Sequence, residues 1–327
     1  MSDGGGAPPA GGPGAGPATP AATTPAGAGP AAPAGAGPGA RRLFVLLKVA
    51  PRPADVYFSA SRAAVDATNA EREIGFSDRT ALEVARILAL EAAAGGGAGA
   101  GGAGAGGAGV GAGTAATQTV EVAALSWGPA ADEKVLRAAL ATGATRLLHI
   151  TTPLDEAAAA DPLVVASGLA AALGRGEPWL VLCGDESADE SRGAVGPMVA
   201  ALLGWPFIGG VVRAKWAAGG ADGAGGAATL EVEAEEGPNL VSYVVRPPVV
   251  LAVNRHGPAP KAASPLQLMK AFRQPVDRLE VEVAAPALKV RSLATTEVKR
   301  RLNEPIPGAA EDALAMLWAK LRERRVI

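Results

Sequence analysis

The segment with the clearest chemical potential spans residues 179–207. It begins with an apolar run of strand length at 179–183, followed by a polar, glycine-punctuated segment at 184–195. Gly196 and Pro197 then open an apolar stretch that stops at Gly204. Proline suits the first position of a helix, and glycine suits the position just past its end. The sequence therefore predicts a strand, a long loop and a helix whose N-terminus faces the loop.

Such an arrangement favours an anionic ligand. Unpaired backbone N–H groups and the positive end of the helix dipole both point at whatever the loop holds, and a phosphate suits them. An ordinary strand-to-helix turn is the alternative, although a loop of this length is more typical of a functional or a disordered segment. The sequence shows no nucleophile–base pair, metal set or paired carboxylates at a plausible spacing, so we expect a binding role without catalytic or metal-ligating residues.

Alternating strands and helices are expected to position this loop. Apolar runs predict strands at 43–48, 120–127, 147–150, 179–183 and 249–253. Helix signals lie between them: a capping-box spacing from Thr80 to Glu83, Gly143 as a stop, and Asp161 followed by Pro162. This order predicts an α/β fold with a mainly parallel sheet, in which ligands bind beyond the carboxyl ends of the strands.

The remaining segments divide the chain into three parts. Residues 1–40 are almost entirely Gly, Ala and Pro, which predicts a disordered head. Residues 41–253 are expected to form the α/β domain, with further strands at 208–216, 228–235 and 240–246, a flexible tip at 219–227 and a flexible Gly/Ala insertion at 92–116. Residues 254–327 are expected to form an irregular arm ending in a helix at 311–325. The apolar face of that helix, which suits a partner subunit, consists of Leu314, Leu317, Trp318 and Leu321.

Composition excludes several classes of protein. The chain has 327 residues and a net charge of −2, so nothing indicates general binding to nucleic acid or to an anionic membrane. Its one cysteine, Cys183, rules out a disulfide framework and a cysteine-based metal site, and is expected to be a buried thiol. No apolar run reaches the roughly 18 residues of a membrane span. Residues 1–40 show no recognisable targeting signal.

Several short motifs occur in an order typical of one family. A strand ends in Leu46-Leu47-Lys48, and a turn, Gly75-Phe76-Ser77-Asp78, precedes Ala81-Leu82-Glu83. Further matches lie at 126–129, at 136–144, at Asp189, at Val195-Gly196-Pro197 and at 266–271. Over most of residues 42–327, this order resembles the β subunit of electron transfer flavoprotein. The resemblance implies a Rossmann-like fold of the adenine nucleotide alpha hydrolase-like type.

The resemblance also implies a function. Such subunits form a heterodimer with an α subunit that carries the redox FAD, and the β subunit holds AMP or, in electron-bifurcating members, a second FAD. The dimer carries electrons from acyl-CoA and related dehydrogenases toward a quinone reductase, and the β subunit performs no bond chemistry. The expected location is the mitochondrial matrix, or the cytoplasm if the source is a bacterium. Carried over by position, the nucleotide contacts are Leu46, Gly75, Phe76, Ser77, Asp78, Trp127, Gly184, Asp185, Glu186, Ser187, Ala188, Asp189, Glu190, Ser191, Arg192, Gly193, Ala194 and Val195.

A second carried-over surface would dock the dehydrogenases. It comprises Pro265, Leu266, Met269 and Lys270, with Pro265 in the place of the family's recognition leucine and Leu266 one step later. From the residues alone, Leu266 and Met269 are also compatible with ordinary core packing, and Lys270 with a solvated surface charge.

The nucleotide loop departs from the family pattern. Gly75 replaces an asparagine, and Asp185 and Glu186 replace a Lys-Gln pair, so acidic groups gather where a phosphate would bind. Like charges 4 Å apart repel by roughly 4 kcal/mol at an effective dielectric near 20, whereas a helix N-terminus attracts an anion by about 0.3–1 kcal/mol. Two alternatives therefore remain open: a structural or interaction subunit without nucleotide or dehydrogenase recognition, and a bifurcating subunit with FAD in this chain.

Overall fold

The computed structural model describes residues 41–59, 64–95, 120–176, 178–217, 228–288 and 305–324. The expected head at 1–40, most of the 92–116 insertion and the tip at 219–227 lie outside these residues.

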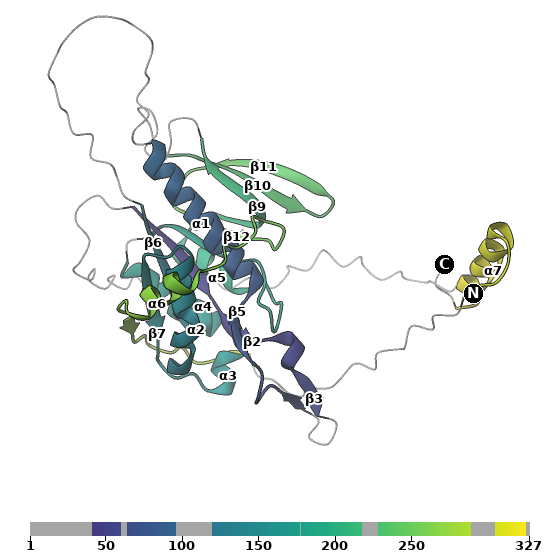
Figure 1. Cartoon of the computed structure of the whole chain (residues 1–327), viewed down its shortest axis with the longest axis horizontal. Helices are drawn as coiled ribbons and strands as arrows, with labels where there is room; N and C mark the ends of the chain where they lie inside the picture. The colour runs from purple at the N-terminus through teal and green to yellow at the C-terminus, as the bar shows by residue number, and fades with distance from the viewer. Residues whose placement is uncertain are drawn as a thin grey trace, which may run out of the picture.

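One sheet organises the described part of the chain (Figure 1). Its strands follow the order β11-β10-β9-β12-β8-β1-β6-β7-β13. Neighbours from β9 to β13 in this order are parallel, whereas β9, β10 and β11 form an antiparallel extension. The predicted α/β fold with a mainly parallel sheet is confirmed. The strands are β1 (Arg42–Leu47), β6 (Glu121–Trp127), β7 (Arg146–Ile150), β8 (Pro178–Gly184), β9 (Phe207–Trp216), β10 (Leu230–Glu236), β11 (Asn239–Val245), β12 (Val249–Val253) and β13 (Asp277–Leu279).

Helices cover both faces of the sheet because the central strands are apolar on both sides. In β1, Leu43 and Val45 pack into the core beneath α1 (Phe76–Gly95) and α2 (Glu133–Thr142). Phe44 and Leu46 point the other way, toward α4 (Pro162–Gly174) and α5 (Val195–Leu203). This alternation follows from the two-residue period of a strand. A short helix, α3 (Glu156–Ala159), precedes α4.

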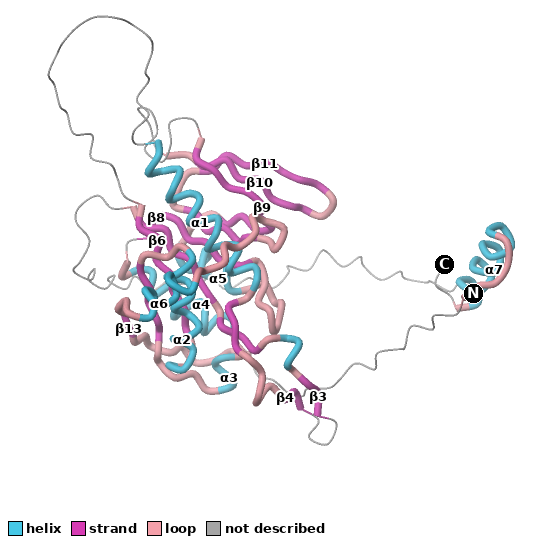
Figure 2. Tube along the Cα trace, in the orientation of Figure 1, coloured by secondary structure: helices cyan, strands magenta, loops and turns pink. Residues whose placement is uncertain are grey.

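Two small antiparallel strand pairs lie outside the main sheet (Figure 2). β2 (Val49–Pro51) pairs with β5 (Arg72–Ile74), and β3 (Tyr57–Ser59) pairs with β4 (Ala64–Asp66). The sequence left open a strand pair or a short helix between residues 55 and 74, and the structure contains strands there. A single turn of 3-10 helix, η1 (Pro53–Asp55), lies between β2 and β3, and a second, η2 (Ala130–Asp132), follows β6.

Helix boundaries agree with the predicted caps in some places and differ in others. Asp161 is the N-cap of α4 and accepts a hydrogen bond from Leu163 N, and Gly204 ends α5 in a left-handed conformation with φ 69°. The capping box predicted at Thr80 is wrong, because α1 begins one turn earlier at Phe76 and the Thr80 hydroxyl donates to the Phe76 carbonyl oxygen. Pro197 is the third residue of α5 rather than the first.

Part of the C-terminal arm packs on the α/β body. α6 (Pro265–Phe272) lies against α2, and β13 extends the sheet beyond β7. Residues 254–288 are therefore not an irregular arm throughout, as the loose sequence pattern had suggested. The terminal helix α7 (Ala310–Glu323) buries none of its residues. In the described part of the chain, no helix is both long enough and apolar enough to cross a membrane.

Candidate functional site

A cavity of about 710 Å³ opens beyond the carboxyl ends of β1, β6, β7 and β8. Along the chain, β6 and β7 are added on one side of β1, whereas β8 and β12 are added on the other. The strand order thus reverses between β1 and β8. In open parallel sheets, ligands bind at such a reversal because the loops diverge there. The cavity lies where the fold predicts a ligand.

Asp78 joins the two strands that border the reversal. Its Oδ2 accepts a hydrogen bond from Lys48 N at 2.7 Å, and its Oδ1 accepts one from Gly184 N at 2.9 Å. Burial raises the pKa of this carboxyl to about 6, and the two backbone hydrogen bonds limit that rise. A methyl group at Gly184 would come within 2.5 Å of Asp78 Oδ1, so only glycine permits this approach. Through the backbone N–H groups of Lys48 and Gly184, Asp78 therefore links the end of β1 to the end of β8 at the edge of the cavity.

Lys48 carries an ammonium group at the polar side of the cavity. Its Nζ lies 2.8 Å from the Asp189 carboxylate and 3.6 Å from Glu190 Oε2, so it ties the loop after β8 to the end of β1. Although burial alone would raise the pKa of Asp189, hydrogen bonds from Lys48 and Ser187 lower it below its ordinary value. The Asp189 carboxylate is therefore charged at neutral pH. The pair is partly exposed and is worth about 1 kcal/mol or less.

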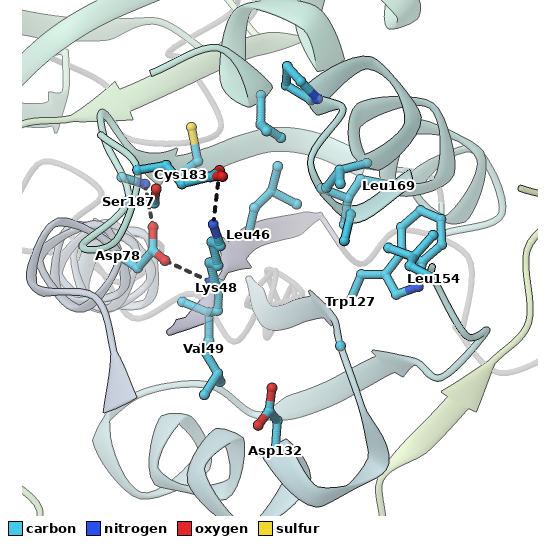
Figure 3. A pocket seen from close by; sticks show the side chains of 18 of the residues that line it. Leu46, Lys48, Val49, Asp78, Trp127, Asp132, Leu154, Leu169, Cys183 and Ser187 are labelled. Carbon is cyan, nitrogen blue, oxygen red and sulfur yellow. Dashed lines mark hydrogen bonds and ion pairs between the residues drawn. The ribbon is translucent and has the colours of Figure 1, made fainter. Parts of the chain in front are cut away.

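The opposite side of the cavity is apolar. Figure 3 shows Trp127, Leu154 and Leu169 together, away from Asp78 and Ser187. Trp127 Nε1 donates to the Thr152 carbonyl oxygen at 2.8 Å, which fixes the indole ring. The ring lies over Gly168 of α4, where a methyl group would come within 2.0 Å of Trp127 Cζ3. This side offers an aromatic surface to a flat, apolar group.

The N-terminus of α5 forms a third part of the wall. Val195 and Gly196 line the cavity in the first turn of the helix, where N–H groups have no acceptor within the helix, and Ala194 provides no side-chain cap. The loop before them is braced by its own backbone, because Ser191 N donates to the Ser187 carbonyl oxygen at 3.1 Å. The first turn of α5, with its uncapped backbone donors and the positive end of the helix dipole, therefore forms part of the cavity wall.

The side chains of the wall include more carboxylates than cations. Arg72 donates to both Asp132 oxygens at 2.6 and 2.7 Å, and Arg192 lies 3.1 Å from Glu190. The lining residues include three cations, each with a carboxylate partner, and a larger set of carboxylates: Asp78, Asp132, Asp185, Glu186 and Glu190. An anionic ligand would therefore depend on backbone donors, or on rearrangement of an ion pair.

Most of the carried-over nucleotide residues lie together in this wall. Twelve line the cavity: Leu46, Asp78, Trp127, Gly184, Asp185, Glu186, Ser187, Glu190, Arg192, Gly193, Ala194 and Val195. Six do not: Gly75, Phe76, Ser77, Ala188, Asp189 and Ser191. Phe76 is instead 46% exposed, with the Arg79 guanidinium 5.6 Å from its ring centroid. Asp189 forms an ion pair with Lys48, which does line the cavity.

Sequence reasoning missed other parts of the wall. Lys48 and the segment after β7, which includes Thr151, Thr152 and Leu154, line the cavity. Lys48 ends one predicted strand and the segment after β7 follows another, so the sequence contained a signal for both. Arg72 carries no such signal, since its place depends on the pairing of β5 with β2. Among the described residues, no group of three or more His, Cys, Asp and Glu side chains is arranged to hold a metal ion.

The expected docking residues lie apart from the cavity, on α6. Pro265 is its first residue, and Ser264 and Gln267 form a capping box at its start. Leu266 and Met269 are 61% and 58% exposed, and Lys270 is exposed beside them. The side chains of Leu266 and Met269 are therefore not packed in the core, which was the alternative interpretation.

The fold and the cavity define an α/β protein with a ligand site at the switch point of a parallel sheet. The model of the electron transfer flavoprotein domain matches residues 109–284, more than half of the chain. The chain belongs to the electron transfer flavoprotein family and is a member of its beta-subunit branch.

Relatives agree with this assignment. The mitochondrial electron transfer flavoprotein subunit beta of Arabidopsis thaliana is 29% identical over 202 residues, covering 60% of this chain and 75% of that protein. The subunit beta of Sus scrofa is 30% identical over 205 residues, covering 62% and 75%. The subunit beta of Homo sapiens is 41% identical over 86 residues, covering 26% and 34%. The family expected from the motifs is confirmed.

Proposed function

We propose that this chain is the β subunit of a heterodimeric electron transfer flavoprotein. With an α subunit that carries the redox FAD, it passes electrons from acyl-CoA and related dehydrogenases toward a quinone reductase. The chain itself performs no bond chemistry and holds AMP as a structural ligand. The observation that carries this proposal is the cavity at the strand reversal, walled by the α5 N-terminus, in a chain of this family.

The two sides of the cavity suit the two ends of a nucleotide. Trp127, Leu154 and Leu169 offer an apolar surface for a base, whereas the first-turn N–H groups of Val195 and Gly196 suit a phosphate. Lys48 adds a cation if its pairing with the acidic loop changes. The residues therefore fit a ligand with one flat apolar end and one anionic end.

The exposed face of α6 supports docking of a dehydrogenase. Leu266 and Met269 are spaced by three residues and lie on one side of the helix, with Lys270 beside them. Exposed apolar side chains beside a charge are typical of a protein contact. The apolar side chains of α7 are a second such surface and suit the α subunit.

A second candidate function follows from the charge of the cavity. Its carboxylates outnumber its cations, and each cation already has a carboxylate partner. These features favour a structural subunit that binds the α subunit without a nucleotide of its own. A bifurcating subunit with FAD in this cavity would place further phosphate charge against the same carboxylates, so the charge balance gives it less support.

The location proposed for the heterodimer is the mitochondrial matrix. The relative from Arabidopsis thaliana is described as mitochondrial. A bacterial cytoplasm is the alternative, and fractionation of the source cells distinguishes the two.

Mass spectrometry of the released nucleotides tests the proposal. The heterodimer is purified and denatured, and the expected result is one AMP for each β chain and one FAD for each dimer. A Trp127→Ala variant should release less AMP but the same FAD, because only the base surface of this chain is removed. Two FAD for each dimer would establish the bifurcating type. FAD without AMP would overturn the AMP site and leave the structural subunit.

A further inference from the structure

The guanidinium group of Arg137, in α2, holds the C-terminal end of α6. Its Nη1 donates to three carbonyl oxygens, those of Ala271 at 3.1 Å, Phe272 at 3.2 Å and Gln274 at 2.7 Å. The last carbonyl groups of a helix have no backbone donor within the helix, and their dipoles favour a nearby cation. Arg137 therefore supplies both hydrogen bonds and charge where α6 ends.

Glu133 orients Arg137 from one turn earlier in the same helix. Its Oε1 accepts from Arg137 Nη2 at 3.0 Å, and its Oε2 accepts from Arg278 of β13 at 2.9 and 3.1 Å. The side chains of Arg137 and Glu133 are only 16% and 13% exposed, so water competes weakly for them. Burial raises the pKa of Glu133, but the hydrogen bonds from Arg278 and Arg137 lower it below its ordinary value. The carboxylate is thus charged at neutral pH.

α6 depends on such contacts because it is short and mostly exposed. Isolated helices of fewer than about 12 residues are marginal in water, and α6 has 8. The capping box at Ser264 satisfies its N-terminal end, and Ala271 is its one buried residue. Leu266, Met269 and Phe272 face outward and gain little from the core. Arg137 therefore sets the position of the C-terminal half of the helix.

We propose, on the basis of the docking role given to α6 above, that Arg137 is a positioning residue for the docking surface. The surface consists of Leu266, Met269 and Lys270, and Arg137 lies behind it and acts through the carbonyl groups of α6. Its partner Glu133 keeps the guanidinium aimed at those groups. Preorganisation of this kind strengthens binding, because the helix is ordered before the partner arrives.

Amide hydrogen exchange of the heterodimer tests the positioning directly. Arg137→Met removes the guanidinium and keeps an apolar stem, so the amides of α6 should exchange at least about tenfold faster, since the loss of even one charge-assisted hydrogen bond has an effect of that size. The amides of β1 serve as the internal reference, so that a global loss of stability is recognised. Arg137→Lys keeps the charge without the planar fork and should restore protection only in part.

Arg278→Met is the matched control. Arg278 donates to the same Glu133 carboxylate but makes no hydrogen bond to the α6 carbonyl groups that Arg137 contacts. Its removal should leave exchange in α6 unchanged. Wild-type exchange in Arg137→Met, or equal acceleration in both variants, would overturn the proposal.

Steady-state kinetics connects the positioning to docking. With an acyl-CoA dehydrogenase as the donor, Arg137→Met should raise the KM for the heterodimer about tenfold and leave kcat unchanged. Leu266→Ala removes a docking side chain and tests the docking role itself. If Leu266→Ala leaves KM unchanged, the docking role fails, while hydrogen exchange still decides what Arg137 does to α6. If Leu266→Ala raises KM and Arg137→Met does not, Arg137 is not a positioning residue for docking.

Discussion

At the scale of single residues, Asp78 shows how a predicted ligand contact can serve the frame of a site. It lines the cavity, yet both of its oxygens accept backbone hydrogen bonds, from Lys48 and from Gly184. These two residues stand at the ends of β1 and β8, between which the strand order reverses. The Asp78 carboxylate links these two strand ends by hydrogen bonds. We therefore expect a ligand in the cavity to contact Lys48 and Gly184 rather than Asp78 itself.

The pH dependence of stability should report this carboxyl group. Burial raises its pKa from 3.8 to about 6 in the folded protein. The folded state therefore binds the proton more tightly, and the resulting stabilisation is complete below pH 3.8 and is lost as pH rises through 6. The loss amounts to about 3 kcal/mol. Urea unfolding between about pH 4 and 7 should show the free-energy difference between wild type and Asp78→Asn shrinking by most of that amount, about 2 kcal/mol. A difference independent of pH would contradict this account.

The sequence identified which residues line the cavity better than it identified what each one contacts. The loop between β8 and α5 was recognisable because a strand, a glycine-punctuated segment and a helix start follow one another. The pairing of Lys48 with Asp189 was not, because these residues are brought together only when β1 and β8 lie side by side. Arg72 of β5 and Asp132 of η2 are likewise brought together only by the fold, since the position of β5 depends on its pairing with β2.

At the scale of elements, α4 and β6 meet at an indole ring and a glycine. Gly168 leaves the space that Trp127 occupies, and Trp127 in turn supplies much of the apolar wall of the cavity. The absence of a side chain at Gly168 therefore allows α4 to pack this closely against the Trp127 ring of β6. Helix propensity alone would favour alanine at this position.

Two glycines of the same helix give a matched pair of variants. Gly168→Ala forces the Trp127 ring to move and should lower the free energy of unfolding by about 1–3 kcal/mol. Gly174→Ala meets no atom within 4 Å and should leave stability unchanged or raise it by up to about 1 kcal/mol. Urea denaturation followed by tryptophan fluorescence measures both. Equal effects of the two substitutions would show that the contact with Trp127 is unimportant.

Helix and strand identities were predictable where the local signal agreed with the fold. Apolar runs located β1, β6, β7, β8 and β12, and Asp161 marked the start of α4. The start of α1 was missed because Thr80 resembles an N-cap. The turn before Thr80 is in fact already helical, and Asp78 in that turn accepts hydrogen bonds from Lys48 N and Gly184 N at the ends of two strands. β13 was missed because a strand of three residues is defined by its neighbour β7 and not by its own pattern.

At the scale of the whole molecule, the terminal helix α7 presents an unburied apolar face. Leu314, Leu317 and Trp318 are 55%, 41% and 50% exposed. Acidic residues in its first turn and basic residues in its last turn suit the helix dipole, so the helix has local support without a core. We expect this face to be covered in the proposed heterodimer.

Substitution on α7 should weaken assembly without weakening the fold of this chain. Trp318→Lys places a charge on the apolar face and should raise the Kd for the α subunit at least tenfold, because burying an unpaired charge is costly. The melting temperature of this chain alone should not change, since the side chain is exposed. Titration calorimetry measures the first and circular dichroism the second. Glu323→Gln, on the opposite side of the helix, is the control, and wild-type affinity in Trp318→Lys would exclude this face from the interface.

The addition of β13 beside β7 has a consequence for synthesis of the chain. The residues that line the cavity all precede Pro197, whereas β13 begins only at Asp277. A chain that emerges from the ribosome N-terminus first therefore presents all the residues of the cavity wall while β7 still has an open edge. Open edges are the places where strands pair with the wrong neighbour. A small molecule that bound this wall early would tie β1, β7 and β8 together during the interval in which the nascent sheet is most exposed to misassembly.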